Sequence, residues 1–458
     1  MTPFKTLQIP EVQRYWIRQA CVPICFLPGG PKTALDRDGA TLVDILVDNH
    51  LIAAIEPAGT AASTDLPAID LESRHVWPTL IDMHAHLDKG HIVTRSENPD
   101  GSFAGALQST TDDRARRWTV EDIKRRMEFG LRCAYVHGVA AIRTHLDSPE
   151  PGLARRNWAT FREARAEWAD RILLQAVALV PIDEFRTPYG GELADLVAAS
   201  GGILGGVTRA AGGVHGELLD DIDPLLDTIL RLASERGLDV DLHVDESGDP
   251  AATALAHVAA AVLRNRFEGR VVCGHCCSLA VQPEEKISRT LDLCAEAGIA
   301  VVTLPTVNLY LQDRCGERTP RWRGVAPVHE MRRRGIPVAI AGDNCRDPFH
   351  AYGDHDMVDT FRQAVRILHL DHPFGDAPVM AGPVPQAIIR AGQLGTITKG
   401  GPARLILFNA RTLNELICRP QSDRLVIDRG RRVFAELPDY GELDGDLGSG
   451  SRHSADSL

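Results

Sequence analysis

The sequence contains no run of about 18 apolar residues, the length that a helix needs to cross a bilayer, and residues 1–10 include no hydrophobic signal segment. Basic residues are not in excess either, because 50 Lys and Arg against 62 Asp and Glu give a formal net charge of −12. This acidity argues against a grip on nucleic-acid phosphates or on an anionic membrane surface. We therefore expect a soluble, cytoplasmic protein with neither nucleic acid nor membrane among its partners.

A disulfide scaffold is also absent from the sequence, since 10 cysteines are spread over 458 residues without the density of small secreted domains. One local exception is Cys273-Gly-His-Cys276, which has the spacing of a thiol-disulfide exchange motif. Such a motif belongs at the start of a helix in a small βαβ domain. Here it ends the apolar run Val271-Val272-Cys273 deep in a long chain. A thiol-disulfide protein that uses Cys273 and Cys276 is therefore only our third functional hypothesis.

The middle of the chain alternates short apolar runs with helix-length segments. Segments such as 120–135, 153–168, 223–236 and 251–265 combine helical spacing with good helix formers. The sequence predicts eight strands at 80–84, 139–144, 172–180, 203–207, 240–244, 271–275, 300–304 and 338–341. Eight alternations predict an α/β fold, a (β/α)8 TIM-type barrel, over residues 78–394.

Two β-rich pieces flank this predicted barrel. Residues 41–47 and 51–55 read as a hairpin with Asp48-Asn49 at the bend, and residues 404–408 and 424–428 read as late strands. We expect residues 13–77 and 395–437 to form one small composite β-sandwich. Residues 438–458 are rich in Gly, Ser and Asp and are predicted to be a mobile, disordered tail.

The ends of the predicted strands carry the residues that suggest chemistry. Alternation along the first strand puts His84 and His86 on one face, with Cα atoms roughly 6.5–7 Å apart. The fifth strand ends at His243, the sixth at His275 and the eighth at Asp343. Catalytic residues of such barrels gather at the C-terminal ends of the strands. Histidines and a carboxylate at one barrel mouth predict a site for Zn²⁺ or Fe²⁺.

The absence of lysine from the fourth strand predicts how many ions the site holds. Hydrolases of this barrel type that bridge two metals often use a carbamylated lysine at the end of that strand. No lysine occurs between Lys124 and Lys286, and the fourth strand ends in Gly206-Val-Thr208-Arg209. We therefore predict one divalent ion.

One divalent ion suggests hydrolysis. Bound water falls from a pKa near 16 to about 7, which makes it a nucleophile at neutral pH. Asp343 can ligate the ion and accept the proton of that water. His275 can hydrogen-bond the same water or the developing oxyanion rather than complete the metal shell. Glu246, three residues past His243, can protonate the substrate and pass a proton to the leaving group, although a solvated loop carboxylate is the simpler alternative.

Six motifs resemble the amidohydrolase superfamily, in particular its cytosine deaminase-like branch, over about residues 40–437. The resemblance implies that His84, His86, His243 and Asp343 are the metal ligands and that His275 and Glu246 are the hydrolytic and proton-shuttling pair. It also implies a homo-oligomer. The motifs are His84-Ala-His86-Leu-Asp88, Arg143-Thr-His145-Leu-Asp147, His243-Val-Asp-Glu246, Gly274-His275, Pro305-Thr-Val-Asn308-Leu-Tyr-Leu-Gln312 and Gly342-Asp343-Asn344…Asp347-Pro348-Phe349.

The departures from cytosine deaminase concern the substrate. Asn344 stands where that enzyme has a second Asp, and Phe349 falls at its stacking Trp. Lys89 and His91 follow the first strand where uncharged residues are common in the family. The Asp343-Asn344 strand end together with His86-Leu-Asp-Lys89 is also similar to triazine aminohydrolases. Lys89 could anchor a ring oxygen or carboxylate, or form a structural salt bridge. Arg209 is a second candidate for an anionic or carbonyl-bearing substrate.

The sequence therefore predicts a mononuclear metal-dependent aminohydrolase of a small N-heterocycle. In this hypothesis activated water attacks a ring carbon, Glu246 protonates the adjacent ring nitrogen, and ammonia or an amine leaves. A cyclic-amide, ring-opening hydrolase in the same fold is the alternative. The sequence leaves open the heterocycle and the choice between zinc and iron.

Overall fold

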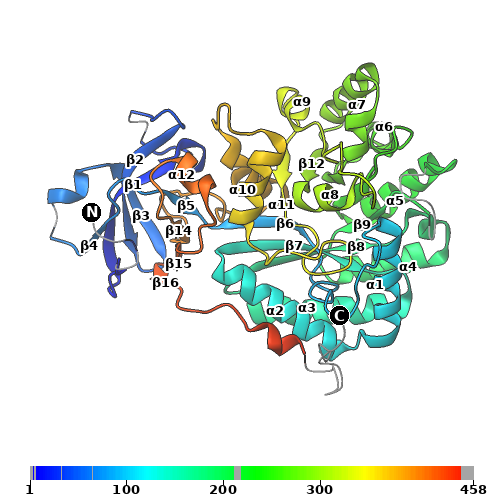
Figure 1. The fold of residues 1–458 in the computed structure, drawn as a ribbon, viewed down its shortest axis with the longest axis horizontal. Coiled ribbons are helices and arrows are strands. Elements are labelled where there is room, and N and C mark those ends of the chain that lie inside the picture. Colours follow the sequence, from blue (N-terminus) through cyan, green and yellow to red (C-terminus); the bar gives the residue numbers. More distant parts are fainter. Residues whose placement is uncertain (1–3, 5–6, 32–33, 64, 211–217, 445–458) are drawn as a thin grey trace.

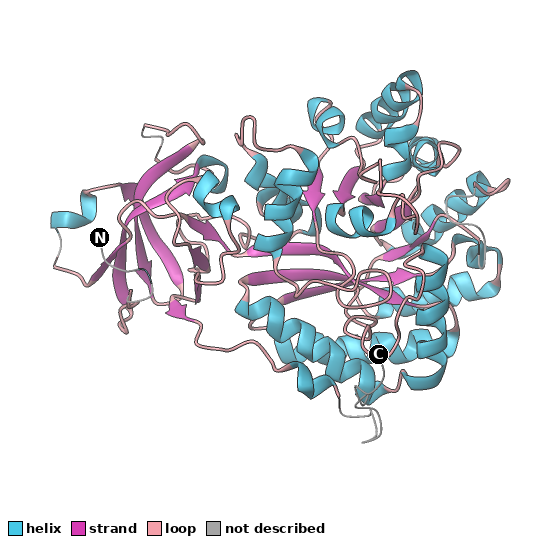
Figure 2. Cartoon of the chain, viewed as in Figure 1, coloured by secondary structure: helices cyan, strands magenta, loops and turns pink. Residues whose placement is uncertain are grey.

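A computed structural model describes the 458-residue chain apart from residues 1–3, 5–6, 32–33, 64, 211–217 and 445–458 (Figure 1). A β-rich region lies beside a larger region of strands surrounded by helices (Figure 2). The β-rich region combines an early segment, coloured blue, with a late one, coloured orange (Figure 1). No helix among the described residues is long and apolar enough to cross a membrane.

Eight parallel strands form the larger region, and each coincides with one of the eight predicted strands. Six neighbouring pairs are hydrogen-bonded in parallel register, from β6 to β8 and from β9 to β13. Bridges from Val177 to Ile203 and from Pro181 to Val207 join β8 to β9. A bridge from Ala85 to Asp343 joins the first strand to the segment after the last, so the sheet closes on itself. The strands are β6 (Leu80–Ala85), β7 (Val139–Asp147), β8 (Leu173–Leu179), β9 (Leu204–Val207), β10 (Val240–Val244), β11 (Val271–His275), β12 (Ala300–Thr303) and β13 (Val338–Ile340).

Helices follow the strands and cover the outside of the closed sheet (Figure 1). Side-chain caps mark where some of them begin: Thr119 accepts from the backbone N–H of Asp122, and Asp356 accepts from that of Val358. The α-helices are α1 (Phe103–Arg117), α2 (Val120–Val136), α3 (Pro151–Trp168), α4 (Pro188–Ala199), α5 (Ile222–Arg236), α6 (Ala254–Asn265), α7 (Glu284–Glu296), α8 (Pro305–Leu311), α9 (Val328–Arg333), α10 (Met357–Leu368), α11 (Pro383–Ile389) and α12 (Leu413–Cys418). Short 3-10 helices are η2 (Ile24–Phe26), η3 (Thr60–Ser63), η4 (Ile182–Arg186), η5 (Cys277–Val281), η6 (Ala377–Ala381) and η7 (Tyr440–Leu443).

The flanking segments form two four-stranded sheets in the orders β3-β2-β1-β4 and β16-β15-β14-β5. The predicted hairpin is present: β2 and β3 pair antiparallel, and Asn49 at the bend has φ 54°, a left-handed conformation that asparagine tolerates. Because β5 pairs with β14, both ends of the chain contribute to one sheet. The strands are β1 (Arg14–Pro23), β2 (Ala40–Asp48), β3 (Leu51–Pro57), β4 (Ala68–Asp70), β5 (Val76–Pro78), β14 (Leu405–Leu407), β15 (Leu425–Asp428) and β16 (Arg431–Arg432).

Trp77 packs these sheets against the barrel. Its ring is fully buried, with ring centroids 5.2 Å from Phe26, 5.4 Å from Phe361 of α10 and 5.5 Å from Phe408. Large aromatic side chains contribute strongly to such packing because each removes much apolar surface from water. The sheets and the first strand of the barrel are therefore joined through one apolar cluster.

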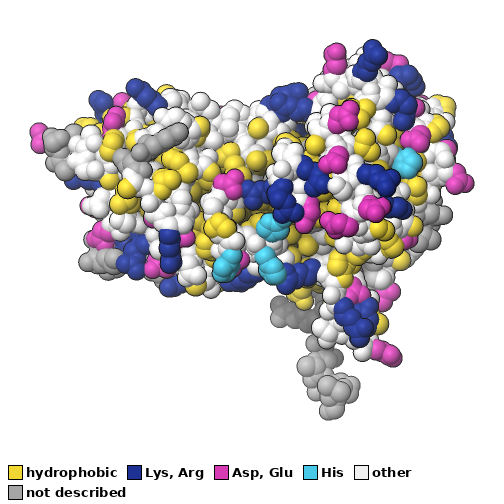
Figure 3. Space-filling model, turned by 90° about the horizontal axis from the view of Figure 1, so that it is seen from above, with side chains coloured by type: hydrophobic (Ala, Val, Ile, Leu, Met, Phe, Trp, Pro, Cys, Tyr) yellow, Lys and Arg dark blue, Asp and Glu magenta, His cyan; other side chains and the backbone are white. Residues whose placement is uncertain are grey.

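The chain returns to the barrel after β16. Residues 438–444, the described part of the predicted tail, include η7 and lie along α2 (Figure 1). Glu442 pairs with Arg132 of α2, and the Tyr440 ring stacks on Phe129 at a centroid distance of 5.6 Å. The remainder of that segment, 445–458, lies outside the described residues. On the face seen in Figure 3, acidic and basic side chains are interspersed.

Candidate metal centre and substrate cavity

Five side chains meet at the C-terminal ends of the barrel strands, as the strand-end rule predicts. They are His84 and His86 at the end of β6, His243 on β10, His275 at the end of β11 and Asp343 after β13. The Nε2 atom of His243 lies 3.1 Å from that of His84 and 3.4 Å from that of His86. Oδ1 of Asp343 lies 3.1 Å from Nε2 of His86 and 3.6 Å from Nε2 of His84. Ligand atoms of His84, His243, His275 and Asp343 all lie within 4.8 Å of one another.

This donor set fits a divalent cation. Neither carboxylate oxygen of the buried Asp343 has a hydrogen-bond partner among the described residues. Burial lowers the pKa of His84 to about 3 and holds the pKa values of His86 and His243 well below 6.5, so these imidazoles are neutral and offer lone pairs. Buried lone pairs that face one another at such distances repel unless a cation lies between them. The residues present therefore match the chemistry of a divalent metal site.

The backbone places these ligands accurately. The N–H of Asp343 donates to the carbonyl oxygen of His84 at 2.7 Å, so the last ligand is fixed to the first. Asp343 and His275 both adopt positive φ, 63° and 67°, where non-glycine residues are uncommon and often functional. Gly274 leaves room for His84, because a Cβ at position 274 would lie 2.9 Å from Cε1 of that imidazole.

Glu246 lies beside His275, and its carboxyl oxygen Oε1 is 3.4 Å from the imidazole nitrogen Nδ1 of that histidine. Burial raises the pKa of Glu246 to about 8, although Arg209 and Lys89 partly oppose the shift. The carboxyl group is therefore largely protonated at neutral pH and able to donate a proton. Asn308 lies 3.2 Å from Nδ1 of the same histidine, and Gln312 donates to the backbone oxygen of Glu246. The solvated loop carboxylate considered above does not describe this residue, which is buried.

One cavity joins the metal cluster to the predicted substrate residues. Lys89, Arg209, Asn344 and Phe349 all contribute to its wall together with Glu246. The full lining is His86, Lys89, Phe103, Leu107, Thr110, Arg114, Asp147, Pro149, Leu179, Val180, Pro181, Val207, Arg209, His243, Glu246, His275, Asp343, Asn344 and Phe349. The cavity wall therefore includes all of the site residues that the sequence singled out except His84, which belongs to the metal cluster but not to the wall.

Two of these residues have partners that restrict what they can offer a ligand. Nζ of Lys89 lies 2.7 Å from Oδ1 of Asp147, so the salt-bridge alternative is present. Burial alone would lower the pKa of Lys89, but the carboxylates of Asp147 and Asp88 outweigh it and raise that pKa. The side-chain amide of Asn344 donates to Oδ2 of Asp347 at 2.6 Å.

Two aromatic rings of the cavity wall each have a cationic side chain over them. Phe103 and Phe349 meet edge to face at a centroid distance of 5.4 Å. Arg209 lies over Phe103 at 5.6 Å, and Lys89 lies over Phe349 at 5.5 Å. Two ring faces backed by positive charges suit a flat, electron-rich ligand that carries oxygen atoms.

Four residues of the site received no role from the sequence. His145 packs against His84 at a centroid distance of 3.9 Å, and Asp147 anchors both Lys89 and Arg114. His145 and Asp147 lie in a motif that carries the family resemblance, and Asn308 lies in another. No local motif marks Phe103, which reaches the cavity only because α1 folds over the barrel mouth.

The thiol-disulfide hypothesis gains no support from the structure. Cys273 and Cys276 are free thiols, fully buried, and burial raises their pKa values well above 9. Cys273 lies within β11 rather than at a helix start. Reactive cysteines are instead partly exposed and have lowered pKa values.

Comparison with known proteins identifies the family. Residues 193–434 match the model of the amidohydrolase family. A pterin deaminase of Rhizobium rhizogenes (strain K84) is 48% identical over 443 residues, which is 96% of this chain and 98% of that protein. The chain therefore belongs to the amidohydrolase family, whose members are metal-dependent and act on non-peptide C–N bonds.

Solved structures show the same fold. A 5-methylcytosine deaminase from Klebsiella pneumoniae, liganded with 5-fluorocytosine, superposes with a TM-score of 0.76 at 22% identity, covering 93% of this chain and 98% of that one. An atrazine chlorohydrolase from Arthrobacter aurescens TC1, complexed with zinc, gives a TM-score of 0.62 at 16% identity, covering 92% and 97%. These likenesses support the TIM-type barrel.

Proposed function

We propose that this protein is a metal-dependent deaminase of an aminopyrimidine fused to a second ring, of the pterin class. The observation that carries the proposal is the protonated, buried Glu246 beside His275, facing three imidazoles and a carboxylate in one cavity. The 48% identity to a pterin deaminase, over almost the whole of both chains, supports the choice of substrate class. The overall reaction exchanges an exocyclic amino group and water for a ring carbonyl and ammonia.

His84, His86, His243 and Asp343 would hold the metal ion. When bound, this ion supplies Lewis-acid activation of water and of the attacked ring carbon. Three imidazoles and one carboxylate suit zinc or iron, and the absence of lysine between Lys124 and Lys286 supports one ion rather than two. Zinc is our first choice because a solved relative of the same fold is a zinc complex.

The side chains around this centre move the protons. The carboxylate of Asp343 accepts the proton that the attacking water gives up. Glu246 donates its proton to the ring nitrogen next to the attacked carbon, so negative charge does not accumulate on the ring. His275 hydrogen-bonds the oxygen that develops on that carbon, and Asn308 holds the imidazole in place. The proton that Asp343 took from the water then passes through Glu246 to the amino group, which leaves as ammonia. Glu246 regains a proton from the new hydroxyl group as the ring carbonyl forms.

The cavity wall accounts for a flat bicyclic substrate. Phe103 and Phe349 offer ring faces, while Arg209 and Lys89 place positive charge where a ring carbonyl would lie. Asp347 accepts from the backbone N–H of Phe349 at 2.8 Å and from Asn344, which fixes the position of the Phe349 ring. We therefore assign binding roles to Lys89, Arg209, Asn344 and Phe349.

Purified full-length protein, loaded with zinc, tests this function on a panel of pterin, cytosine and an aminotriazine. We expect ammonia release from pterin together with formation of the corresponding dioxo-pteridine, and a Glu246→Gln variant should be nearly inactive. A ring-opened acid without ammonia would instead establish the cyclic-amide hydrolase. Activity on cytosine or the triazine alone would refute the substrate class while leaving the deaminase chemistry intact.

We further propose that residues 13–77 and 395–437 form a composite β-sandwich domain beside a barrel of residues 78–394. The pairing of β5 with β14 and the hydrogen bond from the Tyr15 hydroxyl to the Gly430 carbonyl at 2.9 Å support one unit built from both segments. We also propose a homo-oligomer, by family resemblance. Light scattering coupled to size-exclusion chromatography tests the oligomer, and limited proteolysis near residues 78 and 394 tests the division.

A further inference from the structure

A second cluster of metal-binding side chains lies outside the catalytic residues. His91 follows β6, Cys345 follows β13, and His355 precedes α10. One ligand atom from each, a ring nitrogen or the sulfur, lies within 4.8 Å of the other two, and all three residues are buried. None of them has a part in the deamination described above.

We propose that His91, Cys345 and His355 form a second, structural metal site for a thiophilic divalent cation such as Zn²⁺. Two imidazole nitrogens and one thiolate are a common part of structural zinc sites, with the remaining position filled by a fourth ligand. Zinc is favoured because the set combines a soft sulfur with imidazole. Nothing in the hydrolytic reaction requires this second ion.

Unsatisfied polar atoms point to a ligand at this place. Neither ring nitrogen of His91 has a hydrogen-bond partner in the described part of the chain, and neither does Nε2 of His355. Both side chains are more than nine-tenths buried, with 4% and 7% of their surface exposed. A buried imidazole without a partner is costly, and a metal ion would remove that cost. Burial lowers the pKa of His355 to about 4 and that of His91 well below 6.5, so both offer neutral, ligating nitrogens.

The backbone holds the three side chains together at some conformational cost. His91 and His355 have φ values of 62° and 53°, in the left-handed region that non-glycine residues rarely adopt. The N–H of His91 donates to the carbonyl of Cys345 at 3.0 Å, which joins the two segments next to the cluster. Positive φ at two of the three potential ligands is the kind of backbone strain that clusters at functional sites.

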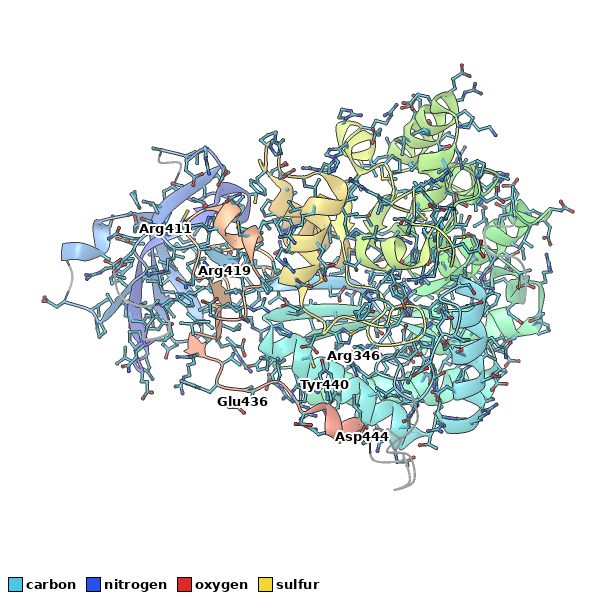
Figure 4. The ribbon with its side chains drawn as sticks, viewed as in Figure 1. Arg346, Arg411, Arg419, Glu436, Tyr440 and Asp444 are labelled. Atoms are coloured by element: carbon cyan, nitrogen blue, oxygen red, sulfur yellow. The ribbon has the colours of Figure 1, made fainter. Side chains whose placement is uncertain are left out.

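Glycine and aromatic residues enclose the cluster. A Cβ at Gly130 of α2 would lie 2.9 Å from Nε2 of His355, so glycine at this position provides the space that the imidazole occupies. The ring of Phe129 covers His91 at a centroid distance of 4.8 Å, and Tyr440 stacks on Phe129 from the C-terminal segment. Figure 4 shows Tyr440 beside Arg346, whose guanidinium lies 4.2 Å from the centre of that ring.

A second cavity gives an ion a route to the cluster. Its wall includes Cys345 and His355 as well as the carboxylates of Asp354, Asp356 and Asp359. These carboxylates have partners of their own, His137 for Asp354, Arg424 for Asp356 and Arg362 for Asp359, so the cavity contributes access rather than a strong attraction. Once bound, the ion would fix the segment after β6, which carries Lys89, to the segment after β13, which carries Asn344. The proposed ion therefore holds together two walls of the substrate cavity.

Cobalt substitution tests the site on full-length protein stripped of metal and given a small excess of Co²⁺. The proposed catalytic ligands include no sulfur, so a thiolate-to-cobalt charge-transfer band reports on the second site alone. We expect this band, and about two metal ions per chain. A His243→Ala variant should lose one ion and keep the band. Absence of the band from the wild-type protein would overturn the proposal, whatever the variants do.

Variants of the proposed ligands test which residues produce the charge-transfer band. Cys345→Ser and His355→Gln should each lose the band and one metal ion while retaining the other. Cys294→Ser is the matched control, because Cys294 is an equally buried free thiol on α7 outside the cluster. It should keep both the band and the metal content. A band that survives Cys345→Ser would place the sulfur ligand elsewhere and refute the assignment.

Discussion

Replacement of Glu246 by Gln tests the proposed proton transfer most directly. Gln keeps the size and the hydrogen-bonding capacity of the side chain but cannot release a proton at neutral pH. Because the pKa of Glu246 is raised to about 8, about nine in ten of these side chains carry the proton at pH 7. The wild-type enzyme therefore starts in the competent state, and the variant has no equivalent state. We expect kcat to fall by ~10²–10⁴-fold, the usual contribution of a general acid-base. That range corresponds to a barrier higher by about 2.7–5.4 kcal/mol.

The assay is ammonia release from pterin with the metal content of each sample measured beside it. The metal content of Glu246→Gln should match wild type, since Glu246 is not one of the proposed ligands. Glu296→Gln, an exposed change at the end of α7, should leave both quantities unaltered. A variant that turns over at the wild-type rate with full metal content would mean that the proton travels by another route.

The pH dependence of the wild-type enzyme follows from the same raised pKa. The protonated form is the active one, and it is lost as pH rises through about 8, so kcat/KM should decline on the alkaline side of that value. Burial, the main cause of the shift, is a property of the free enzyme, so kcat/KM is the appropriate parameter. The alkaline decline should be missing from the residual activity of Glu246→Gln. A wild-type profile that stays flat from pH 7 to pH 10 would contradict the assignment.

Three other substitutions test the remaining roles. His243→Ala should lose the catalytic metal and nearly all turnover, and a variant that keeps both would show that the ligand set is wrong. In the wild-type protein the buried Asp241 lies 2.8 Å from the guanidinium of Arg143, and Arg143→Met removes this ion-pair partner. The free energy of unfolding, measured in urea, should fall by ~3–5 kcal/mol. An unchanged unfolding midpoint would refute the importance of this pair. Phe349→Ala should raise KM for pterin by a factor equivalent to ~1–3 kcal/mol, the free energy that stacking of one base on an aromatic ring contributes, and should affect kcat less. Phe434 is 74% exposed, so the control variant Phe434→Ala should change neither parameter.

The barrel could be predicted from the sequence because its signal is periodic. Parallel strands buried on both faces read as continuous apolar runs, such as Val271–His275, and helices of helical spacing separate them. The strand-end rule then placed His84, His243 and Asp343 together, although neighbouring members of this set lie at least 100 positions apart in the sequence. In the structure their ligand atoms do meet. Strand-end position and spacing suggested catalytic roles for His275 and Glu246, the family resemblance implied the same pair, and the two side chains lie 3.4 Å apart.

The sequence could not show how the substrate residues are engaged. Lys89 is adjacent to the ligands in sequence, but its ion pair with Asp147 depends on how β6 and β7 are aligned. Phe103 enters the cavity from a helix that no strand-end rule covers. His91, Cys345 and His355 are separated by up to 264 positions and share no spacing motif, so only the folded backbone brings them within reach of one another. Local patterns predict elements well, whereas contacts between loops depend on tertiary packing.

The hydrogen bond from the Asp343 N–H to the His84 carbonyl has a consequence for dynamics. This hydrogen bond joins the first strand of the barrel to the segment after the last strand. It also sets the distance between two proposed metal ligands. Any transient separation of the first and last strands must therefore also move these two ligands apart. Amide hydrogen exchange at Asp343 should therefore slow sharply when the protein is loaded with metal, and the escape of the ion should follow the opening of the barrel itself.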